Sequence, residues 1–92
     1  MEELQILRIK ELIAYGQQKT AVEELNKLIE KEPDNANWPY LRGRAYWQLG
    51  EKGKAMTDFE HALHLDPNSP AKLSLEMAHN VMEFFNPDIF NP

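Results

Sequence analysis

The sequence predicts an all-α fold built from short helical hairpins that stack on one another. Along most of the chain, apolar residues recur every three or four positions, which is the helical period, and Gly or Pro separates the periodic segments. The segment near Tyr15 also aligns without gaps with the segment near Leu49, at an offset of 34 residues. A repeat of this length is typical of helix-turn-helix units that bury their apolar faces against each other.

The landmarks of the repeat keep a single register, which chance does not explain. They fall at helix ends, at small residues inside helices and at an acidic-Pro-polar turn. The matched positions are Gly16 with Gly50, Ala21 with Ala55, Leu25 with Phe59, Leu28 with Ala62, and Glu32-Pro33-Asp34 with Asp66-Pro67-Asn68.

The first hairpin joins two amphipathic helices. One is expected over residues 2–15, where apolar side chains keep helical spacing up to the terminating Gly16. The other is expected over residues 19–31, and Pro33 just beyond it cannot continue the helix. Each helix carries one apolar stripe, so the two are expected to pack face to face.

The second hairpin repeats this plan over residues 37–49 and 54–65, with Gly53 in the turn between them. Within it, Gly43 is expected to face Phe59. At the corresponding positions of the first hairpin, Ile9 faces Leu25. A large side chain is exchanged for a small one while the combined bulk stays similar, which is what a packed contact requires.

Several polar residues are candidate helix starts. Thr20 with Glu23 resembles a capping box, although Lys19 could equally open that helix. Asn37 is expected to cap the third helix, whose first turn tolerates Pro39.

A fifth helix is expected to open at Ser69-Pro70 and to continue to Phe85. Its polar residues fall in one narrow sector, so it is apolar over about half its circumference, more than a surface helix ordinarily buries. Pro87 ends it, because a proline inside a helix loses a backbone donor and clashes with the preceding turn.

Composition excludes several classes of function. The 92 residues suit one domain, and fifteen acids against ten Lys and Arg give a net charge of −5, the wrong sign for a nucleic-acid binder. The absence of cysteine favours a cytoplasmic protein. No leader-like segment and no apolar run of membrane-spanning length is present, so no membrane association is expected.

No catalytic arrangement is recognisable, and the chain is predicted not to be an enzyme and to need no cofactor. His61 and His64 stand three residues apart, but with no cysteine and only Asp58 and Glu60 near them they are interpreted as solvent-facing side chains, with no metal site. A Ser-His-Asp order, a glycine-rich phosphate loop and a paired carboxylate site are all missing.

At this point the sequence resembles the tetratricopeptide repeat family. The second unit departs from the family pattern where Pro39 stands at the usual Trp position and Arg42 replaces a Leu, and the first unit keeps chiefly Gly16, Ala21 and Pro33. The signature positions that the second unit fills are Gly43, Tyr46, Leu49-Gly50, Ala55, Phe59, Ala62 and Pro67.

The resemblance implies a right-handed α-solenoid fragment of five helices. On this basis residues 1–92 form one domain, in which repeat one spans residues 2–35 and repeat two spans residues 36–69. A C-terminal capping helix covers residues 70–85, and a tail covers residues 86–92.

In the family, the first helix of each pair lines a concave groove, so the resemblance implies a set of groove residues. The groove candidates are Ile6, Lys10, Ile13, Asn37, Tyr40, Arg44, Trp47, Gln48, Ala78 and Met82, flanked by Glu3, Ala71, Ser74 and Val81.

The middle strip of this groove is aromatic and basic. Tyr40, Arg44 and Trp47 share one helical face, and residues 35–50 hold two Arg and no acid. One interpretation makes the aromatic residues anchors for a peptide, with Arg44 and Lys10 receiving a carboxylate. In the other, the aromatic residues pack on the fifth helix and Arg44 pairs with a nearby acid.

The C-terminal segment repeats its own motif, since Phe85-Asn86-Pro87 recurs as Phe90-Asn91-Pro92. One hypothesis is that the tail docks on the fifth helix or into the groove, of its own chain or of a partner. The alternative is a frayed terminus. The residues expected to serve tail docking or self-association are Met82, Phe85, Ile89 and Phe90.

The sequence therefore predicts a non-catalytic protein-protein interaction module that binds a peptide or helix of another protein in its concave groove. The alternative is a structural protein that self-associates as a homodimer through the apolar fifth helix and tail. Neither the partner nor the choice between monomer and dimer follows from the sequence, because a scaffold does not determine function.

Overall fold

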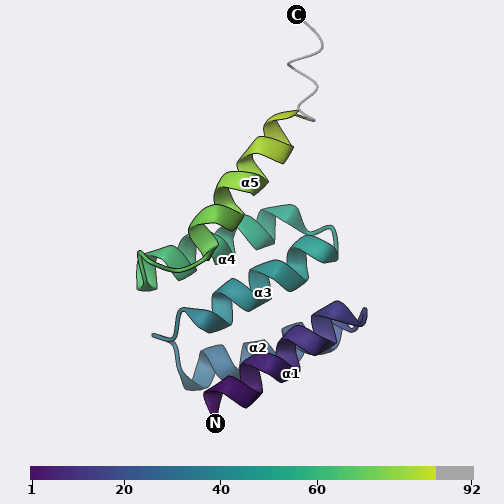
Figure 1. The fold of residues 1–92 in the computed structure, drawn as a ribbon, viewed down its shortest axis with the longest axis vertical. Coiled ribbons are helices and arrows are strands. Elements are labelled where there is room, and N and C mark those ends of the chain that lie inside the picture. The colour runs from purple at the N-terminus through teal and green to yellow at the C-terminus, as the bar shows by residue number, and fades with distance from the viewer. Residues whose placement is uncertain (85–92) are drawn as a thin grey trace, which may run out of the picture.

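A computed structural model describes residues 1–84, with backbone only for residues 82–84, and these residues form five α-helices and no strand (Figure 1). The all-α prediction is confirmed, and every described helix end lies within two residues of its expected position. The helices are α1 (Glu2–Ala14), α2 (Gln18–Lys31), α3 (Asn37–Gln48), α4 (Lys52–Leu65) and α5 (Ala71–Phe84).

Two glycines end helices as the sequence predicts. Gly16 follows α1 with φ +83°, and Gly50 follows α3 with φ +82°, a left-handed conformation that favours glycine. The residue after each glycine donates its N–H back to a helix carbonyl, Gln17 to Leu12 at 2.8 Å and Glu51 to Tyr46 at 2.9 Å. These bonds pair carbonyls in the last turn that the helix itself leaves without a partner.

Three sequence expectations about helix starts and turns are wrong. Thr20 and Gly53 lie inside α2 and α4, which begin earlier, and α2 has no side-chain capping hydrogen bond. Asn37 is already helical, because the Oδ1 atom of Asn35 accepts its N–H at 3.0 Å and tightens the preceding turn. By contrast, Ser69 does cap α5, since its Oγ accepts the N–H of Ala71 at 3.1 Å.

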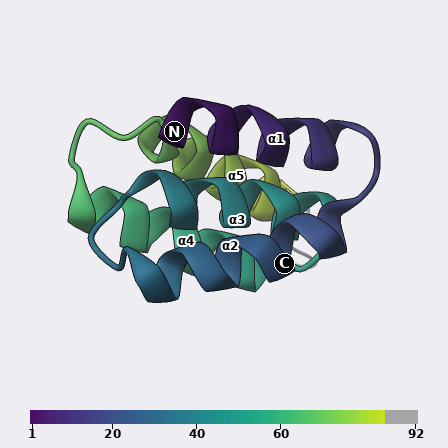
Figure 2. The ribbon, with the colours of Figure 1, turned by 90° about the horizontal axis from the view of Figure 1, so that it is seen from below.

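Helix α3 lies in the middle of the array. Figure 2 shows α2 and α4 along one side of the molecule and α1 along the opposite side, with α3 between them. Consecutive helices are neighbours, and α3 contacts α1, α2 and α4. The arrangement is the stacked-hairpin array that the repeat predicts.

The first core lies where α3 meets the first hairpin. Trp38 is fully buried there, and its indole N–H donates to Glu32 Oε1 at 2.8 Å. Trp38 stands one residue before the usual Trp position of the repeat, which Pro39 occupies, and its burial is a finding of the structure. The buried residues of this core are Ile9, Ile13, Ala21, Leu25, Trp38, Leu41 and Ala45.

A second, smaller core joins α4 to its neighbours and includes Ala55, Phe59, Ala62 and Ala71. The expected contact between Gly43 and Phe59 is confirmed: a Cβ atom built on Gly43 would lie only 2.7 Å from Phe59 Cε1. Close approach of α3 to α4 therefore depends on this glycine.

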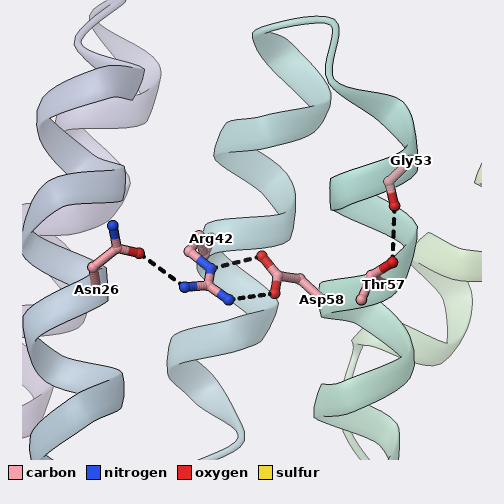
Figure 3. A network of polar contacts seen from close by, with 5 residues as sticks. All are labelled: Asn26, Arg42, Gly53, Thr57 and Asp58. Atoms are coloured by element: carbon pink, nitrogen blue, oxygen red, sulfur yellow. Dashed lines mark hydrogen bonds and ion pairs between the residues drawn. The ribbon is translucent and has the colours of Figure 1, made fainter.

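An ion pair joins the two helices of the second hairpin, and a hydrogen bond extends it to the first hairpin (Figure 3). Arg42 on α3 donates from Nε and Nη2 to the two carboxylate oxygens of the buried Asp58 on α4, both at 2.8 Å, and from Nη1 to Asn26 Oδ1 on α2 at 2.8 Å. The hydrogen bonds to Asp58 raise the pKa of the Arg42 guanidinium above its ordinary value, so it stays charged. The Arg that departs from the family pattern thus ties three helices together.

Candidate functional site

A pocket of about 210 Å³ opens at the junction of α3, α4 and α5. Its walls combine aromatic and aliphatic side chains with one guanidinium, which is the composition of a site for an apolar side chain that has a polar neighbour. The residues that line it are Arg44, Trp47, Gln48, Phe59, Ser74, Met77, Ala78 and Val81.

Of the predicted aromatic and basic strip, Arg44 and Trp47 form the α3 wall, whereas Tyr40 packs partly buried against both cores. The guanidinium carbon of Arg44 lies 5.9 Å from the ring centroid of Tyr40, and the Nζ atom of Lys52 lies 4.3 Å from that of Trp47. Tyr40 also packs its ring 6.2 Å from the ring of Phe59. Two cations are thus held against aromatic rings at one end of the array.

Arg44 forms no ion pair with any side chain that the structure describes. The interpretation in which it pairs with a nearby acid therefore has no support among the described residues. None of the described residues that line the pocket is acidic, so Arg44 gives this wall a positive charge in a chain of net charge −5. An anionic group would therefore meet a positive charge and no acidic side chain among these described lining residues.

The α5 wall includes Ser74, Ala78 and Val81, as the repeat register implies, and differs from that register at Ala71 and Met77. Ala71 is fully buried in the second core and Ala78 is 2% exposed, whereas Met77, which the sequence analysis did not select, lines the pocket and is 58% exposed. The small Ala side chains allow α5 to approach α4 closely. This orientation turns the neighbouring Met77 and Val81 toward the pocket.

The groove candidates from α1 do not reach this pocket. Ile13 is 2% exposed and belongs to the first core, so it is not available to a ligand. Ile6 packs partly buried against the same core, and Lys10 is exposed. On α3, Asn37 donates to Glu2 Oε2 at 2.7 Å, which ties the starts of α1 and α3 together.

Gln48 does line the pocket, and its Oε1 accepts a hydrogen bond from Gln18 Nε2 at 2.8 Å. The side chain of Met82, and all of Phe85, Ile89 and Phe90, lie outside what the structure describes. Their assignment to the groove, to tail docking or to self-association stays a prediction.

His61 and His64 are both exposed on α4, and residues 1–84 hold no cluster of three or more His, Asp or Glu side chains that could bind a metal ion. Of the helices in this part of the chain, none has the length and apolar character needed to cross a membrane.

Comparison with known proteins places the chain among helical repeat proteins. A tetratricopeptide repeat profile matches residues 40–69. DnaJ protein P58IPK homolog A of Oryza sativa subsp. japonica is 32% identical over 62 residues, which are 67% of this chain and 13% of that protein. The Protein SGT1 homolog of Bos taurus is 42% identical over 57 residues, 60% of this chain and 16% of that protein. The chain thus spans 13% to 16% of the length of these two relatives.

One solved structure matches along nearly the whole chain. The solution NMR structure of Bacteroides fragilis protein BF1650 superposes with a TM-score of 0.85 at 35% sequence identity, and the match covers 95% of this chain and 89% of that one.

Proposed function

Since this chain belongs to the tetratricopeptide repeat family, we propose that it is a non-catalytic binding module that takes a peptide or helix of a partner protein in its concave groove. The proposal treats residues 1–92 as one cytoplasmic domain with repeats at 2–35 and 36–69. The repeats and the relatives support protein-protein interaction in general.

The pocket at the α3–α4–α5 junction is the observation that supports groove binding. Trp47, Met77 and Val81 offer apolar contact, and Arg44 lies beside them with no ion pair to a described residue. A partner segment would insert one large apolar side chain here and place a carboxylate near Arg44. Aromatic and Arg residues around a pocket are the groups that most often dominate such binding.

A peptide-display selection tests this function. Peptides selected on the immobilised chain are expected to carry an apolar residue near an acid, and to lose at least tenfold in affinity on Met77→Glu or Arg44→Ala. Arg8→Ala is the matched control, because Arg8 lies in the first hairpin, outside the pocket, where it pairs with Glu24 at 3.0 Å. Peptide affinities that are the same for the original chain and for both pocket variants would refute groove binding.

Self-association is a second candidate, supported by a different observation. Leu73 and Met77 on α5 are 63% and 58% exposed, an unusual amount of uncovered apolar surface for the last described helix. An α5-to-α5 homodimer would cover it. Light scattering over a concentration series distinguishes the two, since a homodimer raises the measured mass and Leu73→Glu abolishes the rise, whereas a free groove leaves a monomer.

A further inference from the structure

The pocket imposes a joint chemical requirement on whatever fills it. An apolar side chain is needed to cover Trp47, Met77 and Val81, and an anion within a residue or two is needed to reach Arg44. This requirement rests on the proposed function, because it concerns the same groove. It also allows every segment of the chain itself to be compared with the pocket.

Residues 86–92 of this chain meet the requirement. Their sequence is Asn-Pro-Asp-Ile-Phe-Asn-Pro, in which Asp88 directly precedes Ile89 and Phe90. Asp88 is the only charged residue between Glu83 and the last residue given, so its charge is not offset by a neighbouring base. One acid and two large apolar side chains therefore stand side by side, as the pocket demands.

The segment also has the reach. Helix α5 runs to Phe84, and Met77 lies seven residues before that end, a distance of roughly 10 Å along the axis at about 1.5 Å per residue. The chain from Phe84 to Phe90 spans up to roughly 20 Å when extended, at about 3.3 Å per residue. The chain is therefore long enough to turn at Asn86-Pro87 and return along α5, and Asn-Pro favours such a turn.

We propose that residues 86–92 fold back onto their own chain, so that Ile89 or Phe90 enters the pocket beside Trp47 and Met77 while Asp88 pairs with Arg44. The segment is then an intramolecular competitor for the groove. A partner must displace it, and the apparent affinity of the partner falls by the fraction of molecules whose pocket is open. A short tether makes such competition effective, because its effective concentration reaches the millimolar range.

NMR spectroscopy on the full chain and on a chain ending at Phe85 tests the contact. Docking predicts that deletion of residues 86–92 shifts the Trp47 indole and the amides of Ser74 and Val81, and leaves the amides around Arg8 and Glu24 unchanged. Asp88→Asn and Phe90→Ala are expected to reproduce part of the shifts, and His61→Ala, on the exposed side of α4, none of them. Unchanged pocket resonances after deletion would overturn the proposal.

Titration with a synthetic peptide of residues 86–92 adds an affinity readout. The peptide should bind the shortened chain and bind the full chain at least threefold more weakly. Met77→Glu should remove both the binding and the difference between the two chains. Equal affinity for the two chains would overturn docking in cis. A second result would also overturn it, namely chemical-shift differences between the full and the shortened chain that vanish on dilution, together with a dimer in light scattering. The segment would then fill the groove of a second copy.

The two proposals fail separately. Display-selected peptides that bind both chains equally and remain sensitive to Met77→Glu would leave groove binding in place and refute tail docking. Peptides whose affinity for both chains is unchanged by Met77→Glu would refute groove binding itself.

Discussion

The two junctions of this array are built on the same register and pack in different ways. At the first junction, α3 buries Trp38, Leu41 and Ala45 against the α1–α2 hairpin, each at 1% exposure or less. At the second junction, the residues 34 positions later are Lys72, Leu75 and His79, of which Lys72 and His79 are exposed. The first junction is a filled core, and the second contains the pocket.

The physical cause lies in what each helix can bury. Burying Lys72 and His79 without partners would be costly, so α5 is turned by about one residue and buries Ala71 and Ala78 instead. Alanine is too small to replace Trp38, and Figure 1 shows the second half of α5 leading away from α3. Replacement of large apolar residues by small ones at this interface thus leaves a pocket where the first junction has a filled core.

The sharpest way to break this contrast is to remove one tryptophan from each junction. Trp38→Ala is expected to lower the free energy of unfolding by about 3–5 kcal/mol, since it empties a fully buried site and leaves Glu32 without its donor. Trp47→Ala, which truncates a half-buried side chain at the pocket, is expected to cost about 1 kcal/mol or less. Urea unfolding followed by circular dichroism measures both, and equal losses would contradict the distinction.

The ion pair between α3 and α4 comes next in expected effect. Asp58→Ala is expected to cost about 3 kcal/mol, because Arg42 loses two hydrogen bonds and is left partly buried without its counter-charge. The double variant Arg42→Leu with Asp58→Ala should recover much of that loss, since an apolar pair of similar bulk needs no counter-charge. A double variant as unstable as Asp58→Ala alone would show that the pair is not the cause.

The glycine contact between α3 and α4 allows a matched pair of substitutions. Gly43→Ala is expected to destabilise by about 1–3 kcal/mol, because the new methyl group would meet the Phe59 ring at 2.7 Å and the Ala55 carbonyl oxygen at 3.1 Å. Gly53→Ala, inside α4 with nothing within 4 Å of the new Cβ, is expected to stabilise by about 0.5–1 kcal/mol. Thermal melts measure the change in stability caused by each substitution, and a change of the same sign for both would refute the packing explanation.

The smallest effect on stability is expected at the pocket itself. Met77→Gln replaces a side chain that is 58% exposed and should change the free energy of unfolding by no more than about 0.5 kcal/mol. The same substitution should weaken the display-selected peptides at least threefold, as measured by calorimetry. Loss of stability instead of affinity would mean that Met77 belongs to the core.

Local signals in the sequence were sufficient for the existence of the helices and for the C-terminal ends of α1 and α3. Gly16 and Gly50 adopt the left-handed conformation that ends helices, and the facing of Gly43 and Phe59 followed from their place in the repeat. The helix starts were less predictable. The third helix was expected to be capped by Asn37, but the side chain that binds its backbone belongs to Asn35. Two neighbouring Asn residues offer the same hydrogen-bonding group, and only the path of the turn selects one.

The candidate site was predictable only in part. The α3 strip of Arg44 and Trp47 followed from helical spacing, and both residues line the pocket. Ile13 was expected in the groove but is buried, and Met77 was missed because the repeat register does not reveal how far α5 is turned. A signal was available in retrospect, since Lys72 and His79 occupy the positions at which α3 buries Trp38 and Ala45.

The sequence by itself determined that this chain forms stacked helical hairpins, because helical period, terminating glycines and the 34-residue repeat are all local or pairwise patterns. Tertiary structure alone decided which faces of those helices meet. Burial is a collective outcome in which small residues, charged residues and a single glycine compete for the same interfaces. The pocket exists because that competition was resolved differently at the two junctions of the array.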